Sequence, residues 1–193
     1  MPSAPAAMIL IWFVLPLWLL AGVADWWCHR LTGIERTAGA KESVLHLVMF
    51  AEMGAPLLAV IFLEINAAIL ALMIAAFLLH EVTAQWDVSY AITRRHVGAF
   101  EQHVHSFLEL VPLLAIVCII LLHWGQFLAL FGLGHERADF ALRLKSAPLP
   151  APFIVGLLTA VVLLEVVPYI EELVRCLRNN QHVRAAALVV QQR

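Results

Sequence analysis

Five long apolar runs, separated by short polar stretches, dominate the hydropathy pattern of the chain. The runs cover residues 8–27, 44–63, 66–86, 107–133 and 153–174. An apolar helix needs about 20 residues to cross the hydrocarbon core of a bilayer, because each residue adds about 1.5 Å. The pattern therefore predicts five transmembrane helices.

The shortest polar interruption lies between the second and third runs. It consists of Glu64, Ile65 and Asn66, and it holds no glycine or proline. A single helix from Val44 to Trp86 would nevertheless be about 64 Å long, roughly twice the thickness of the bilayer core. We therefore expect a turn at this interruption.

Composition supports the same fold class. Hydrophobic residues make up 63% of the 193 residues and charged residues 13%, whereas a water-soluble domain has about 45–50% apolar and about 25% charged residues. A net charge of -2 gives no basis for binding nucleic acid. We expect an all-α, integral membrane helical bundle that forms a single domain over residues 1–193 and is surrounded by membrane lipids.

The positive charges predict an orientation. With five spans, one face of the membrane holds residues 28–43, 87–106 and the C-terminal tail. Nine of the 12 Lys and Arg residues lie on that face and three on the other. The nine are Arg30, Arg36, Lys41, Arg94, Arg95, Arg175, Arg178, Arg184 and Arg193, and the three are Arg137, Arg143 and Lys145. Cytoplasmic loops carry the excess of Lys and Arg, so we expect the C-terminus inside and the N-terminus outside, in a bacterial inner membrane.

A repeated pair of an acid and a histidine suggests a metal site. An acidic residue four positions before a histidine shares its helix face, one turn away. Three such pairs occur: Asp25/His29, Glu42/His46 and Glu101/His105. With 14 acids and 9 histidines in the chain, chance predicts about 0.65 such pairs when matches are counted.

The position of the pairs strengthens this interpretation. The first pair ends the first span, the second begins the second span and the third begins the fourth span, so all three reach the cytoplasmic edge. His80 and Asp87, seven residues apart on one helix face, bring the third span to the same edge, with Glu81 as a reserve ligand. We therefore expect eight ligands around one site: Asp25, His29, Glu42, His46, His80, Asp87, Glu101 and His105.

The ligand types indicate which metal would bind. Mixed imidazole and carboxylate ligands suit iron, manganese or zinc. Four helices that give such ligands to a bundle core resemble the ferritin-like di-iron proteins in ligand type and placement, which implies a four-helix metal-binding core with two irons. Their Glu-x-x-His signature is absent, as are the dense histidine boxes of membrane desaturases and hydroxylases.

Two other interpretations of the cluster remain open. Haem would need two opposed histidines, for which His46 and His105 are the candidates, but it does not need a carboxylate one turn from each. Charged residues also collect at helix ends of any membrane protein, where they meet water and lipid headgroups.

Three functions follow from these alternatives. The first is a di-iron or other di-metal oxidoreductase that acts on a lipid or other apolar substrate at the cytoplasmic face and takes electrons from a donor. The second is a transporter or channel for metal ions or protons, with Glu52, Glu109 and Glu165 inside three spans as its path. The third is a membrane partner subunit with haem or a structural metal and no catalysis of its own.

Overall fold

The computed structural model describes residues 5–191, and side chains are described for residues 5–182. The described residues form helices joined by short connections, with one isolated bridge between Leu63 and Leu144 and no strand. The elements are α1 (Pro5–Ile9), η1 (Leu10–Val14), α2 (Leu15–Thr32), η2 (Ile34–Arg36), α3 (Ala40–Phe62), α4 (Ala67–Ala91), α5 (Ala99–Leu122), α6 (Trp124–Leu130), α7 (Ala151–Val161), η3 (Val162–Val166) and α8 (Val167–Gln191).

Five helical stretches are long and apolar enough to cross a membrane, as the apolar runs predict. They are Pro5–Thr32, Ala40–Phe62, Ala67–Ala91, Ala99–Leu122 and Ala151–His182. The chain is therefore a membrane protein with an all-helical fold. The helices extend beyond the apolar runs at the ends that carry polar residues, because backbone hydrogen bonding continues into the charged turns.

The predicted fourth span, residues 107–133, is wrong at both ends. The helix begins earlier, at Ala99, and it ends at Leu122, after which His123 leaves the helical conformation with φ -128° and ψ 40°. The apolar residues that follow form the separate short helix α6. Gln126 in α6 explains the break: its side chain bonds the backbone N–H groups of Ala67 and Asp139, at 3.2 and 3.1 Å. A hydropathy profile does not detect these hydrogen bonds of Gln126.

The turn between the second and third spans is confirmed. Leu63 is extended, and Asn66 caps α4 by accepting a hydrogen bond from the backbone N–H of Ile69 at 3.2 Å. The Asn66 amide also donates to the carbonyl of Ala141 at 2.9 Å. A side-chain cap of this kind replaces the glycine or proline that usually marks a turn.

Two spans contain a short π-helical segment, and each segment ends two residues before a proline. Leu10–Val14 precedes Pro16, and Val162–Val166 precedes Pro168. Proline has no N–H and its ring clashes with the carbonyl one turn earlier, which disturbs the regular hydrogen-bond ladder. The second segment carries Glu165 and sets the direction in which this side chain leaves the last span.

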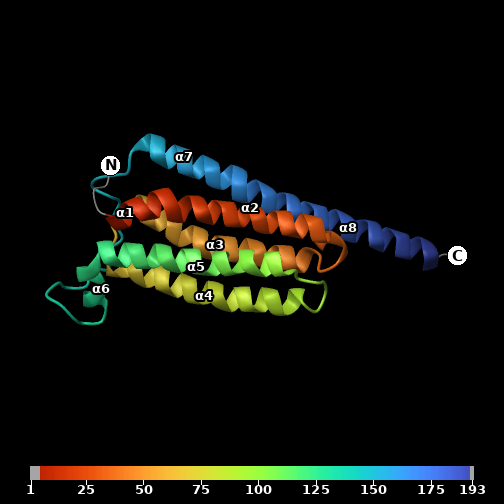
Figure 1. Ribbon diagram of the computed structural model, residues 1–193, viewed down its shortest axis with the longest axis horizontal. Helices are drawn as coiled ribbons and strands as arrows, with labels where there is room; N and C mark the ends of the chain where they lie inside the picture. The colour runs from red at the N-terminus through yellow and green to blue at the C-terminus, as the bar shows by residue number, and fades with distance from the viewer. Residues whose placement is uncertain (1–4, 192–193) are drawn as a thin grey trace.

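The helices pack as an elongated bundle (Figure 1). α3 packs against α4 and α8, and α2 against α5. α7, η3 and α8 form one long helix that leans across the bundle, and α8 continues past its end. α7 diverges from its neighbours and has no buried residue.

The two ends of the bundle have different interiors. We call the end with the 33–39 and 92–98 connections the site end, and the other the apolar end. The core of the apolar end is a cluster of aliphatic side chains from α3, α4 and α5: Ala59, Ile69, Leu70, Met73, Ile116 and Ile119. The interior of the site end consists largely of buried acids and histidines.

Candidate metal centre

Four helices bring the three acid–histidine pairs and Asp87 to the site end. α2 ends there, α3 and α5 begin there, and α4 passes its last turns there. The residues that meet at this end, together with Arg95 and Glu172, are called the centre below: Asp25, His29, Glu42, His46, Asp87, Arg95, Glu101, His105 and Glu172. All are buried except His105, whose side chain is 14% exposed.

Two histidines lie face to face in the middle of the centre. The rings of His29 and His46 are parallel within 6°, with 4.3 Å between ring centroids. His105 meets His29 edge to face, at 6.3 Å. The sequence suggested His46 and His105 as the opposed pair, whereas the structure places His29 opposite His46.

A glutamate outside the predicted ligand set holds both rings. The two carboxylate oxygens of Glu172 in α8 lie 3.0 Å from Nδ1 of His29 and 2.9 Å from Nδ1 of His46. A carboxylate only accepts hydrogen bonds, so Nδ1 of each ring carries the hydrogen. In a neutral ring this leaves the lone pair on Nε2, on the side away from Glu172, and that is the form in which a histidine binds a metal through Nε2.

Both Nε2 atoms face carboxylates without forming hydrogen bonds to them. Nε2 of His29 lies 3.5 Å from Asp25 and 3.4 Å from Glu101, and Nε2 of His46 lies 3.3 Å from Asp87. These two nitrogens and Oδ1 of Asp87 are buried and have no hydrogen-bond partner in the described part of the chain. Buried polar atoms are nearly always paired, so three unpaired atoms in one place require an explanation.

Two groups of side chains have the spacing to hold an ion. Asp25, His29 and His105 form one group, and His29, Glu42 and His46 form the other. In each group the possible ligand atoms lie within 4.8 Å of one another.

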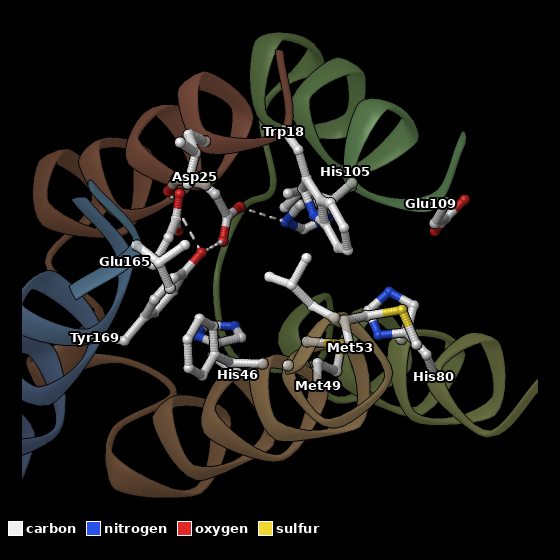
Figure 2. Close-up of a pocket in the computed structure, with 18 of the residues that line it drawn as sticks. Trp18, Asp25, His46, Met49, Met53, His80, His105, Glu109, Glu165 and Tyr169 are labelled. Carbon is white, nitrogen blue, oxygen red and sulfur yellow. Dashed lines mark hydrogen bonds and ion pairs between the residues drawn. The ribbon is translucent and has the colours of Figure 1, made fainter. Parts of the chain in front are cut away.

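Asp25 connects the centre to the last span (Figure 2). One of its oxygens lies 2.9 Å from Nε2 of His105. The other accepts a hydrogen bond of 3.2 Å from the Tyr169 hydroxyl. Both oxygens of this buried carboxylate are therefore directed by neighbours on different helices.

Arg95 is buried between two of the predicted acidic ligands. It enters the centre from the 92–98 connection and donates to Glu42 at 2.5 and 3.0 Å and to Glu101 at 2.5 and 2.9 Å. Burial alone would lower the pKa of Arg95, but its hydrogen bonds with Glu101 and Glu42 outweigh burial and raise that pKa above its ordinary value. In the sequence Arg95 counts among the loop cations, and its position six residues before Glu101 carries no signal of this contact.

His80 lies deeper in the membrane-spanning part and belongs to neither three-residue group. Its nearest acidic atom is an oxygen of Glu52, 3.8 Å from Nδ1, and the other oxygen of Glu52 accepts a hydrogen bond from Thr83 at 2.8 Å. His80 lines the cavity beside the centre and stands apart from His46 in Figure 2.

A cavity of about 130 Å³ adjoins the centre on its membrane side. Its polar wall and its apolar wall come from all five spans. The polar wall consists of Asp25, His46, His80, Asp87, His105, Glu109, Glu165 and Tyr169. Figure 2 shows Trp18, Met49 and Met53 closing its apolar side. Glu109 stands apart from Asp25 and Glu165 in that view, so Glu109 and Glu165 lie on different walls of the cavity.

Comparison with protein-family models, with curated proteins and with solved structures finds no match to this chain.

Proposed function

We propose that the chain is a membrane metalloprotein whose centre binds two divalent metal ions, with iron preferred, and that it oxidises a lipid or other apolar substrate. The observation that carries the proposal is the pair of stacked histidines. Glu172 holds Nδ1 of both rings, and both Nε2 atoms are left unpaired and facing carboxylates. Carboxylate–histidine pairs of this kind orient metal ligands in metalloproteins.

The charge of the centre supports two ions. It contains the carboxylates of Asp25, Glu42, Asp87, Glu101 and Glu172 and one guanidinium, that of Arg95. Ionised, these groups leave four uncompensated negative charges, and buried uncompensated charge is strongly unfavourable. Two divalent cations would neutralise that excess.

Protonated histidines would neutralise the centre less well. The rings of His29 and His46 are 4.3 Å apart, and two imidazolium ions at that distance would repel each other. Neutral imidazoles stack without this repulsion, and the neutral ring is the form that binds a metal.

Different residues of the centre would hold the two ions. Asp25, His29 and His105 would hold one ion, and His46 with Asp87 would supply ligands for the second. Arg95 would keep Glu42 and Glu101 in place and compensate part of their charge. Imidazole with carboxylate favours iron, with manganese and zinc as alternatives.

Iron bound there would supply oxygen activation. An oxidation of this class consumes one O₂ with two electrons and two protons, places one oxygen atom in a C–H bond and releases the other as water. The electrons require an external donor, and the cytoplasmic face is where we expect it. Removing the buried Arg95 from the surface charges leaves eight cations against three, so the charge argument for that orientation persists.

Ion transport is the second candidate, because Glu109 and Glu165 line the cavity next to the centre. A transport path must continue to the other face of the membrane. The neighbouring space toward the apolar end is lined by apolar side chains, with Lys145 as its single charged lining residue among those described. Such a lining favours a hydrocarbon over an ion. Haem is disfavoured because the imidazoles of the centre face carboxylates instead of an open gap between opposed rings.

Metal analysis of the purified protein tests the proposal. We expect about two ions per chain in the wild type after growth with iron, and loss of most metal in His46→Ala, because one imidazole ligand is removed. His103→Ala is the matched control, since His103 is exposed on α5 two residues from His105. A wild-type protein that retains no metal, or that loses as much metal in His103→Ala as in His46→Ala, would overturn the proposal.

A further inference from the structure

A second cavity, of about 210 Å³, lies beyond the first toward the apolar end. Its lining is aliphatic and aromatic apart from Lys145 at its far end. The two cavities share five lining side chains: Leu15, Trp18, Met53, Leu57 and Leu157. The shared wall consists of flexible or rotatable apolar side chains, which can shift to join the two spaces.

The size of the joined space suits a small molecule. Ligand pockets usually enclose about 300–1,000 Å³. Neither cavity reaches this range alone, and the two together reach its lower end. The joined space is long, because it extends from Asp25 near the end of α2 to Leu10 in η1, about 15 residues or roughly 22 Å of helix.

The second cavity borders the lipid-facing helix α7. Phe153 and Leu157 of α7 line it, and α7 has no buried residue of its own. Figure 1 shows α7 diverging from the other helices at the apolar end. A loosely packed helix beside an apolar cavity provides a lateral route from the hydrocarbon of the bilayer.

The polar wall of the first cavity includes an unpaired carboxyl oxygen from outside the centre, that of Glu165. Glu165 is 7% exposed, and its Oε1 has no hydrogen-bond partner among the described residues. Gly22 on α2 permits its position, since a Cβ at residue 22 would lie 2.0 Å from Oε2 of Glu165. The carboxyl group is thus held at the cavity wall with one oxygen unsatisfied.

We propose that the joined cavities bind a single-chain lipid that ends in a small uncharged polar group, such as a long-chain alcohol. The hydrocarbon lies in the second cavity, and the hydroxyl bonds Glu165 next to the centre. A hydroxyl can donate to an ionised carboxylate or accept from a protonated one, so it pairs with Glu165 in either state. An anionic carboxylate head group has no donor, so it can pair only with a protonated Glu165 and is repelled by an ionised one. That the metal acts near this end of the lipid rests on the function proposed above.

Equilibrium binding of radiolabelled 1-hexadecanol to the purified full chain tests the proposal. Gly54 lines the first cavity, and a Cβ added there meets no atom within 4 Å. Gly54→Leu should therefore fold and fill the space, weakening hexadecanol binding about tenfold or more, the effect of a few methylenes in an apolar pocket. Gly156→Leu is the matched control, because Gly156 is exposed on α7 with equally open space and lines neither cavity.

A second variant and a second probe complete the test. Leu157→Phe, in the wall shared by both cavities, should also weaken hexadecanol binding. Hexadecanoate, which carries a charged head, should bind the wild type at least about tenfold more weakly than hexadecanol. Equal binding of the two probes, or unchanged hexadecanol binding in both cavity variants, would overturn the proposal.

Metal content separates this test from the preceding one. Gly54→Leu and Leu157→Phe should keep the metal content of the wild type, since neither residue belongs to the centre. Hexadecanol binding that depends on Gly54 in a protein without metal would overturn the metal centre and support the lipid site. Metal without hexadecanol binding would overturn the lipid site alone.

Discussion

The apolar end and the site end of the bundle solve the same packing problem in opposite ways. At the apolar end, Ile69, Leu70 and Met73 fill the space between helices with aliphatic groups. Their attraction is the sum of many weak contacts, which tolerate small changes of shape. At the site end, helices are joined through buried charges, each of which depends on a particular partner. One fold thus places shape-tolerant aliphatic packing and buried charge at different depths of the membrane.

Removing the Arg95 guanidinium should lower the stability of the protein more than any other change considered below. Arg95→Leu leaves Glu42 and Glu101 buried without their shared counter-charge, and the loss of one partner of a buried ion pair costs about 3–5 kcal/mol of the free energy of unfolding. Thermal or denaturant unfolding in detergent measures this change. Arg94→Leu is the control, because Arg94 is exposed and its Cζ lies over the Tyr90 ring, 5.4 Å from the ring centroid. Comparable destabilisation by the two changes would contradict the role given to Arg95.

Changing the glutamate behind the histidines should have an intermediate effect, on binding more than on folding. Glu172→Gln keeps the shape of the side chain, but an amide cannot accept from both rings through two oxygens. We expect metal affinity to fall about 10–100-fold, as for other changes behind metal ligands. Metal titration of the stripped protein checks this, with the neighbouring Glu171→Gln as control, since Glu171 pairs with Arg30 and Arg175 near the surface. An affinity unchanged in Glu172→Gln would show that the histidines do not depend on it.

A small change at the apolar end should have the smallest effect. Ile69 is 1% exposed within the aliphatic cluster, and Ile69→Val removes one methylene, which costs about 0.5–1.5 kcal/mol of unfolding free energy. Metal content and metal affinity should remain those of the wild type. A loss of metal in this variant would mean that the two ends are coupled through the bundle and would remove the distinction between them.

The sequence predicted what depends on local spacing. Apolar length predicted the five spans, and the helical repeat correctly placed Glu101 and His105 at the same end as His29 and His46. It could not predict Glu172, because the contact of this residue with His29 joins positions 143 residues apart and no histidine stands four residues from it. Arg95 was hidden for a different reason: a cation in a connecting loop has the same sequence signature whether it faces water or turns inward.

The grouping of His80 with the other candidate ligands depended on a seven-residue repeat, and the structure shows what that repeat leaves out. Position on a helix face does not fix depth, and His80 lies almost two turns deeper than Asp87. There its neighbours are Glu52 and the cavity. Gln126 shows the same limit at the apolar end. Its amide bonds a distant loop, and α5 ends just before it although the apolar run continues.

The origin of Glu172 in the fifth span has a consequence for biosynthesis. Helices enter the membrane in the order in which the ribosome makes them, so four spans with their acids and histidines are inserted before Glu172 is translated. Until then, His29 and His46 lack the group that fixes their orientation. A chain that stops after the fourth span would therefore carry most of the candidate ligands without the residue that orients two of them. If the proposed centre binds metal, it would become fully competent to do so only after the fifth span has been inserted.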